Sequence, residues 1–152
     1  MFNLISQKVD TIHKQYRINT FPVPIADIEQ ILIDLDYDIM ILSDITKACV
    51  IGDTIMMPNA ETPQYRRLLA HEVGHVFLHD YNTFRQISSN NRKFEAQADA
   101  FAAYFLMPND TFMKDLRTYN EYDLSELYGL PIDFIHFRIK LIDHKAAWHL
   151  FF

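Results

Sequence analysis

The chain has 152 residues, of which 49% are hydrophobic and 22% charged, with a formal net charge of −6. This composition suits one compact domain, excludes a mainly disordered chain and disfavours non-specific binding of nucleic acid. The single cysteine, Cys49, excludes an internal disulfide framework and every thiolate-rich zinc site, so a transition metal would have to be held by histidine and carboxylate side chains.

Two helices are predicted before the first strand. Apolar residues recur at helical spacing over residues 3–17 and again over residues 24–35, which is the pattern of amphipathic helices. Pro22 and Pro24 lie between the two runs. Since proline removes a backbone donor and constrains the residue before it, these prolines should separate the helices.

Three short runs of β-branched and other apolar residues follow, over residues 37–42, 48–51 and 54–58. Turn residues separate the runs, and Gly52 with Asp53 provides one tight turn. We therefore predict a small antiparallel sheet of about three strands.

After the strands the chain is predicted to be largely helical. Thr62 followed by Pro63 is typical of an N-cap and a first helical turn, and it should open a helix that continues to residue 79. A second long helix is predicted over residues 92–107 and should end near Pro108.

The C-terminal part is predicted to hold two or three shorter helices over residues 110–141, with a break at residues 129–131. The apolar segment 146–152 is expected to dock on the body of the protein or on a partner. Together these elements predict one α+β domain over residues 1–152. It would be mainly helical, with a helical subregion over residues 110–145.

No segment of the sequence is typical of export or of membrane insertion. The first residues include Lys8 and Asp10 and lack an apolar run, so a signal peptide is not expected. The longest stretch of low charge, residues 100–108, is too short to span a bilayer. We expect a cytoplasmic protein without a membrane partner.

The strongest chemical signal is His71-Glu72-Val73-Gly74-His75, a His-Glu-x-x-His motif within a predicted helix. Histidines four residues apart lie on one helical face, so both rings can reach one metal ion. Glu72 lies beside them, close enough to hold a water at the metal. A chance match in a purely structural helix is the alternative, and the helical context disfavours it.

A third ligand should come from another element, because catalytic zinc usually takes three protein ligands and keeps one position open. Glu95 is the best candidate, since it lies in an alanine-rich helix that could pack closely on the histidine helix. Asp99, one turn later on the same face, could accept the second ring proton of a ligand histidine.

The remaining candidates carry weaker signals. His79 continues the four-residue spacing but should lie too far along the helix to join the metal, so we expect a helix-end residue whose positive charge is favoured there. Cys49 is expected to be a small core residue. Tyr104 and His136 are candidates for stabilising an oxyanion. Four histidines without a supporting pattern are expected at the surface or at the edge of the core: His13, His136, His144 and His149.

Residues 71–75, together with Glu95-Ala96-Gln97-Ala98-Asp99-Ala100-Phe101-Ala102-Ala103 and the Leu-Met-Pro that follows, resemble the ImmA/IrrE metallopeptidases of bacteria, phages and mobile elements. The resemblance covers roughly residues 20–110, which it implies to be the catalytic core, and the C-terminal helices follow the family only loosely. Phe105 stands where the family usually has leucine.

The resemblance implies a zincin-like fold with the sheet packed on the His-Glu-x-x-His helix. It also implies a gluzincin-type site, in which His71, His75 and Glu95 bind one zinc ion and Glu72 is the general base. Other divalent metals such as manganese or cobalt suit the same ligands. The substrate class it implies is a helix-turn-helix repressor, whose cleavage would induce a mobile element, a prophage or stress genes.

Two alternatives stay open beside a zinc metalloendopeptidase. One is a non-proteolytic, metal-binding anti-repressor that acts by binding its partner. The other is a DNA-binding regulator that uses residues 122–142 as a helix-turn-helix, with Arg138 and Lys140 as its basic residues. The acidic balance of the chain disfavours direct contact with nucleic acid. Nothing in the sequence predicts the oligomeric state.

Overall fold

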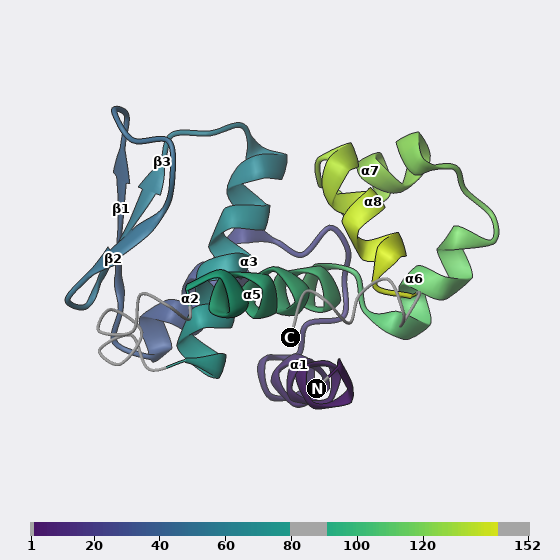
Figure 1. The fold of residues 1–152 in the computed structure, drawn as a ribbon, viewed down its shortest axis with the longest axis horizontal. Coiled ribbons are helices and arrows are strands. Elements are labelled where there is room, and N and C mark those ends of the chain that lie inside the picture. The colour runs from purple at the N-terminus through teal and green to yellow at the C-terminus, as the bar shows by residue number, and fades with distance from the viewer. Residues whose placement is uncertain (1, 80–90, 143–152) are drawn as a thin grey trace.

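Two long helices form the centre of the molecule and pack against each other: α3 (Thr62–Leu78) and α5 (Asn91–Leu106) (Figure 1). The computed structural model describes residues 2–79 and 91–142. Within these ranges the chain forms a single α+β domain with seven helices and one sheet of three strands. The predicted fold class, mainly helical α+β, is confirmed.

The two N-terminal helices lie close to their predicted bounds. Helix α1 (Phe2–Tyr16) packs against α5, and α2 (Ile25–Asp34) packs against α3. Each contributes an apolar face to the core, as the helical spacing predicted. Helices α1 and α2, which precede the sheet in the sequence, thus each cover one of the two central helices.

The sheet contains β1 (Asp38–Leu42), β2 (Cys49–Ile51) and β3 (Thr54–Pro58), in the order β1-β3-β2. Strands β2 and β3 form the predicted hairpin, and Gly52 in its turn has a left-handed φ of 62°. Strand β1 instead pairs in parallel with β3, so the prediction of a fully antiparallel sheet is wrong.

Burial accounts for this strand order. In β3 the side chains of Ile55 and Met57 have no exposed surface, and β3 packs against α3. The outer strands are partly exposed, since Met40 and Ile41 of β1 are 49% and 57% exposed. Because the most apolar strand gains most from central burial, β3 lies between the two earlier strands.

The contact between α3 and α5 depends on small residues. A Cβ atom added at Gly74 would lie 3.1 Å from the carbonyl oxygen of Ala98 and 3.1 Å from the Cβ of Phe101. Buried alanines on α5, among them Ala98 and Ala102, allow the same close approach. The prediction that small residues bring α5 near the histidine helix is therefore confirmed.

The start of α3 differs in detail from the prediction. Its N-cap residue is Glu61, and Thr62 is the first helical residue. The predicted capping role of Thr62 is wrong, whereas Pro63 does lie in the first turn. Proline is tolerated there because the first helical amides have no partner within the helix.

Three short helices complete the described chain: α6 (Asn109–Leu116), α7 (Glu121–Tyr128) and α8 (Ile132–Lys140). They lie together beside the α3–α5 pair (Figure 1). A capping box between Asn120 and Asp123 begins α7, and Gly129 ends it with a left-handed φ of 59°. The predicted break at residues 129–131 is thereby confirmed, while the apolar segment 146–152 lies outside the described residues.

Arg138 joins α8 to the end of α5. It is only 1% exposed, its Nε donates to the carbonyl of Met107 at 2.8 Å, and its Nη2 donates to Asn109 at 2.6 Å. The guanidinium also lies over the rings of Tyr104 and Phe112, with centroid distances of 4.7 Å and 4.9 Å. A side chain held in this way cannot serve as the DNA-contacting residue that the helix-turn-helix alternative required.

None of the helices in residues 2–79 and 91–142 combines the length and the apolar character needed to cross a bilayer. The longest of them, α3, has 17 residues and carries charged and polar side chains throughout.

Candidate metal centre

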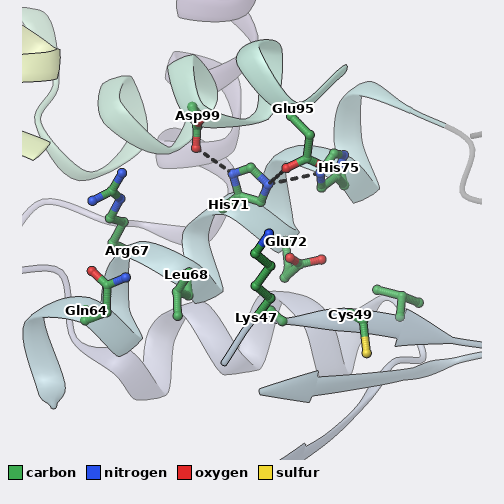
Figure 2. Close-up of a pocket in the computed structure, with 12 residues that line it drawn as sticks. Lys47, Cys49, Gln64, Arg67, Leu68, His71, Glu72, His75, Glu95 and Asp99 are labelled. Atoms are coloured by element: carbon green, nitrogen blue, oxygen red, sulfur yellow. Dashed lines mark hydrogen bonds and ion pairs between the residues drawn. The ribbon is translucent and has the colours of Figure 1, made fainter. Parts of the chain in front are cut away.

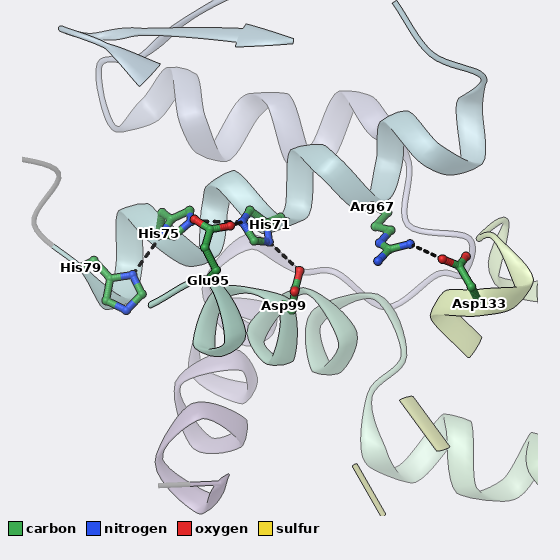
Figure 3. Close-up of polar contacts among 7 residues, drawn as sticks. All are labelled: Arg67, His71, His75, His79, Glu95, Asp99 and Asp133. Carbon is green, nitrogen blue, oxygen red and sulfur yellow. Dashed lines mark hydrogen bonds and ion pairs between the residues drawn. The ribbon is translucent and has the colours of Figure 1, made fainter. Parts of the chain in front are cut away.

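Helix α3 places His71 and His75 one turn apart with their rings facing each other. Their Nε2 atoms are 3.0 Å apart, and the ring centroids are separated by 4.7 Å. The ring of His75 is almost fully buried at 2% exposure. Figure 3 shows both rings directed from α3 towards α5. This is the arrangement expected for histidines at positions i and i+4.

Glu95 on α5 completes a compact group with these two rings. Its Oε2 lies 2.9 Å from Nε2 of His71, and its Oε1 lies 2.8 Å from Nε2 of His75. One ligand atom from each of the three residues lies within 4.8 Å of the others. We call these three residues the metal cluster. The structure brings them together as the sequence predicted.

Asp99 contacts the other side of His71. Its Oδ1 lies 2.8 Å from Nδ1 of His71, so the carboxylate accepts the proton on that nitrogen. The ring orientation is thus fixed by Asp99, and Nε2 is directed into the metal cluster. The contact predicted for Asp99 is present.

The charges within the group shift two pKa values in opposite directions. Burial disfavours the charged form of His71, but hydrogen bonds to Asp99 and Glu95 outweigh it and raise the pKa of His71 to about 10. Burial also opposes ionisation of Glu95, yet its hydrogen bonds to His71 and His75 lower the pKa of Glu95 well below the ordinary range. In the metal-free chain, a proton on His71 therefore balances part of the negative charge.

The sequence did not predict the partner of His75. Nδ1 of His75 lies 3.1 Å from Nδ1 of His79, and Nε2 of His79 lies 2.9 Å from Oε1 of Gln97. His79 is outside the metal cluster, as predicted. Burial lowers the pKa of His79, which contradicts the expectation of a favoured positive charge at the helix end. The four-residue spacing between His75 and His79 was the feature of the sequence that could have predicted their contact.

Glu72 lies beside the cluster at the wall of a cavity of about 450 Å³. Its side chain is on α3, next to His71 and His75, and is 5% exposed. The first turns of α3 extend the same wall through Gln64, Arg67 and Leu68. Figure 2 shows these side chains around one opening.

The opposite wall of the cavity is formed by residues 47–50, which include the start of β2. Cys49 belongs to this wall and is exposed, so the prediction of a buried core cysteine is wrong. A three-residue edge strand gives too short an alternation to reveal which side faces the core. Lys47 is the wall's one charged residue and lies across the cavity from α3 (Figure 2).

The two candidates for oxyanion stabilisation lie elsewhere. Tyr104 is 6% exposed and stacks with Arg138, and His136 pairs with Glu121 at the surface. Neither is among the residues that line the cavity. His13, whose Nε2 lies 2.9 Å from the carbonyl oxygen of Phe105, does lie at the edge of the core as predicted. His144 and His149 are outside the described residues.

The donor set of the metal cluster fits a divalent transition metal. Two imidazole nitrogens and one carboxylate are the ligands that zinc takes in catalytic sites with an open fourth position. Cobalt and manganese accept the same donors. The cluster of His71, His75 and Glu95 could therefore hold a metal ion.

The comparison with protein families is consistent with this geometry. A family model described as Peptidase_M78, IrrE N-terminal-like domain, matches residues 54–140. The match runs from β3 through α8, so it includes the C-terminal helices that the sequence resemblance placed only loosely. No curated protein matches the chain significantly. Since the matched segment covers more than half of the chain and contains the whole metal cluster, the chain belongs to the Peptidase_M78 family of IrrE N-terminal-like domains.

Proposed function

We propose that this protein is a zinc-dependent metalloendopeptidase, with His71, His75 and Glu95 as metal ligands and Glu72 as general base. The observation that carries the proposal is the convergence of three ligand atoms within 4.8 Å of one another beside a buried glutamate in an open cavity. A structural polar cluster would not need an open cavity at its ligand atoms. Membership of a peptidase family also supports the proposal of peptidase activity.

The chain's own residues would divide the work. A zinc ion at the cluster would supply a Lewis acid that polarises a peptide carbonyl and lowers the pKa of water. Glu72 would accept the proton of the attacking water and then donate it to the leaving amine. Asp99 would keep Nε2 of His71 directed at the metal through its contact with Nδ1.

The cavity also indicates how a peptide would be held. Among the described strands, β2 pairs only with β3, and residues 47–50 face the metal cluster across the cavity. An extended peptide could add to this edge by main-chain hydrogen bonds, which are independent of its side chains. The scissile bond would then lie between β2 and α3.

We propose a helix-turn-helix repressor as the substrate, as the family resemblance implies. The net charge of −6 would attract a basic DNA-binding partner. Cleavage of such a partner would relieve repression of the genes it controls, in a mobile element, a prophage or a stress response. The anti-repressor alternative predicts the same partner but no fragments.

The decisive experiment compares the wild-type protein with Glu72→Gln, using as substrate a helix-turn-helix regulator, taken from beside this gene where one is encoded there. Glutamine keeps the size of the side chain but cannot accept the proton. We expect regulator fragments only with the wild type, while both proteins carry equal amounts of zinc by elemental analysis. If Glu72→Gln cut at the normal rate, the assigned role of Glu72 would be wrong.

The same experiment separates the two functional classes. Complex formation with the regulator, measured by size-exclusion chromatography, should survive in Glu72→Gln because the variant keeps the surface of the cavity. Stable binding without fragments by the zinc-loaded wild type would instead support the non-proteolytic anti-repressor. Glu126→Gln, on the exposed side of α7, serves as the matched control and should cut like the wild type.

A further inference from the structure

The two histidines of the metal cluster make hydrogen bonds through Nδ1, the ring nitrogen outside the cluster, to chemically different partners. His71 contacts a carboxylate, since its Nδ1 lies 2.8 Å from Asp99. His75 contacts a neutral pair, because its Nδ1 lies 3.1 Å from Nδ1 of His79 and Nε2 of His79 lies 2.9 Å from Oε1 of Gln97. The proposed mechanism does not use this second pair.

The hydrogen bonds determine which ring nitrogen carries each proton. Oε1 of Gln97 can only accept, so Nε2 of a neutral His79 carries the proton and Nδ1 of His79 is the acceptor. Nδ1 of His75 must then be the donor. Nε2 of His75, which lies 2.8 Å from Oε1 of Glu95 and 3.0 Å from Nε2 of His71, is then the ring nitrogen left to bind a metal.

The surroundings hold the pair in place. Gln97 is buried at 8% exposure, and the ring of Phe94 packs on the ring of His79 with centroids 4.3 Å apart. Gln97 lies two residues after Glu95 on α5, while His79 lies at the C-cap of α3. Helix α5 thus supplies the ligand Glu95 and also Gln97, which accepts the last hydrogen bond in the series that begins at Nδ1 of His75.

We propose that His79 and Gln97 are positioning residues for the metal, which fix His75 in the tautomer that presents Nε2 to the cluster. The inference rests on the proposed function in one respect, the binding of a metal by His71, His75 and Glu95. It adds that the neutral pair of His79 and Gln97 fixes the tautomer of His75, as the carboxylate of Asp99 fixes that of His71. Partners of this kind change metal affinity by about 10- to 100-fold when removed.

The test measures zinc affinity by competition with a chromophoric chelator, and the visible spectrum of the cobalt-substituted protein. His79→Phe removes the acceptor but keeps an aromatic ring against Phe94, and it should weaken zinc binding by about 10- to 100-fold. Gln97→Leu should also weaken zinc binding, because it removes the acceptor for Nε2 of His79. His79→Asn places an amide oxygen near the former Nδ1 position, so it should restore most of the affinity and the wild-type cobalt spectrum.

Phe94→Leu is the matched control, because it disturbs the packing around His79 and leaves both hydrogen bonds possible. It should bind zinc within a few-fold of the wild type. Wild-type affinity in His79→Phe, or an equal loss in Phe94→Leu, would overturn the positioning role while leaving the proposed peptidase intact. A wild-type protein that binds neither zinc nor cobalt would overturn this inference together with the proposed metal site.

Discussion

Helix α5 takes part in two polar clusters that each contain an almost fully buried side chain, and a cavity of about 450 Å³ opens beside one of them. Near its N-terminal end Glu95 meets the two histidines of α3. At its C-terminal end the carbonyl of Met107 accepts from Arg138. The most buried side chain does not distinguish the clusters, because His75 is 2% exposed and Arg138 is 1% exposed, although the side chain of Glu95 is 49% exposed.

The direction of the polar atoms does distinguish them. In the metal cluster the ligand atoms of three side chains converge on one point. Around Arg138 the donors point outwards to a carbonyl and an amide, and aromatic rings cover the faces of the guanidinium. A buried charge is therefore not by itself a sign of function, whereas convergent lone pairs beside a cavity are.

The pKa shifts alone would not have separated the two clusters. Burial lowers the pKa of Arg138 to about 10, which leaves it charged at neutral pH. The pKa of His71 rises to about 10. Arg138 is shifted mainly by loss of solvent, and His71 is shifted by carboxylates strong enough to overcome that loss. The cause of a shift is more informative than its size.

The largest effect should follow from breaking the metal cluster with Glu95→Gln. The substitution keeps the shape of the side chain but removes the negative charge that attracts a divalent metal and makes the oxygen a strong ligand. We expect zinc affinity to fall by more than the roughly 100-fold that an indirect partner costs, with cleavage lost in proportion. Chelator competition measures the first effect, and unchanged circular dichroism would show that the Arg138 cluster still holds the fold.

Breaking the other cluster should have the opposite profile. Arg138→Met leaves the carbonyl of Met107 buried without its donor, so the free energy of unfolding should fall by about 2 to 4 kcal/mol. Urea denaturation measures this loss. Below its unfolding midpoint the variant should bind zinc as the wild type does, and weakened zinc binding would show that the clusters are coupled through α5.

Arg67→Met is the matched control for that experiment. Arg67 forms an ion pair with Asp133 at 2.9 Å, but the two side chains are 25% and 72% exposed. Exposed pairs contribute roughly 0 to 1 kcal/mol. Arg67→Met should therefore cost much less stability than Arg138→Met, although both substitutions remove one guanidinium that lies over a phenylalanine ring.

The contrast also explains what the sequence could predict. His71 and His75 were predictable because helical spacing alone puts side chains four residues apart on one face, and the same spacing put Asp99 on the face of Glu95. Glu95 needed the further inference that an alanine-rich helix packs closely on α3. The role of His79 was missed although its four-residue spacing from His75 was a local signal, and Gln97 was missed because its contact with His79 depends on how α3 and α5 cross, an angle that no local pattern encodes.

The order of the strands, and whether a given side chain is buried or exposed, were harder to predict. The parallel pairing of β1 with β3 depends on which strand gains the central position, which is a tertiary effect. Cys49 lies in a strand too short for its alternation to be interpreted. The disfavoured helix-turn-helix alternative counted Arg138 among its basic residues, as arginine is usually exposed, and only the docking of α8 on α5 buries it.

The pH dependence should separate the clusters further. His71 must lose its proton to bind a metal, and carboxylates hold that proton with a pKa of about 10. Zinc affinity should therefore rise with pH, by up to about tenfold per unit between pH 7 and pH 9. Asp99→Asn removes one carboxylate and should flatten this slope, whereas Arg138→Met should leave it unchanged.

The stability of the metal-free protein should change in the reverse direction. The pKa of His71 is higher in the folded chain than the ordinary value of 6.5, so its contribution is fully present below pH 6.5 and is lost as the pH rises towards 10. Thermal unfolding of the chelator-treated protein from pH 6 to pH 10 measures this. A metal-free protein that became more stable over that range would contradict the assigned charge of His71.

A small effect on both stability and zinc affinity should come from the contact that sets the distance between the two helices. In Gly74→Ala the new methyl group would lie 3.1 Å from the carbonyl of Ala98, so α5 must move away by a few tenths of an ångström. Alanine favours a helix by about 1 kcal/mol over glycine, but overpacking costs roughly 1 to 3 kcal/mol. We expect a net loss near 1 kcal/mol.

Zinc affinity should fall with it, by a few-fold, because Glu95 and Asp99 move together with Ala98 while His71 stays on α3. The larger Gly74→Val should extend both losses, since the same backbone contact must open further. A Gly74→Ala protein that gained the full helix-propensity term and bound zinc like the wild type would mean that the interface adapts without moving α5. The close approach would then be dispensable, and the geometry of the metal cluster would have to be set by the hydrogen bonds of Asp99 and His79 alone.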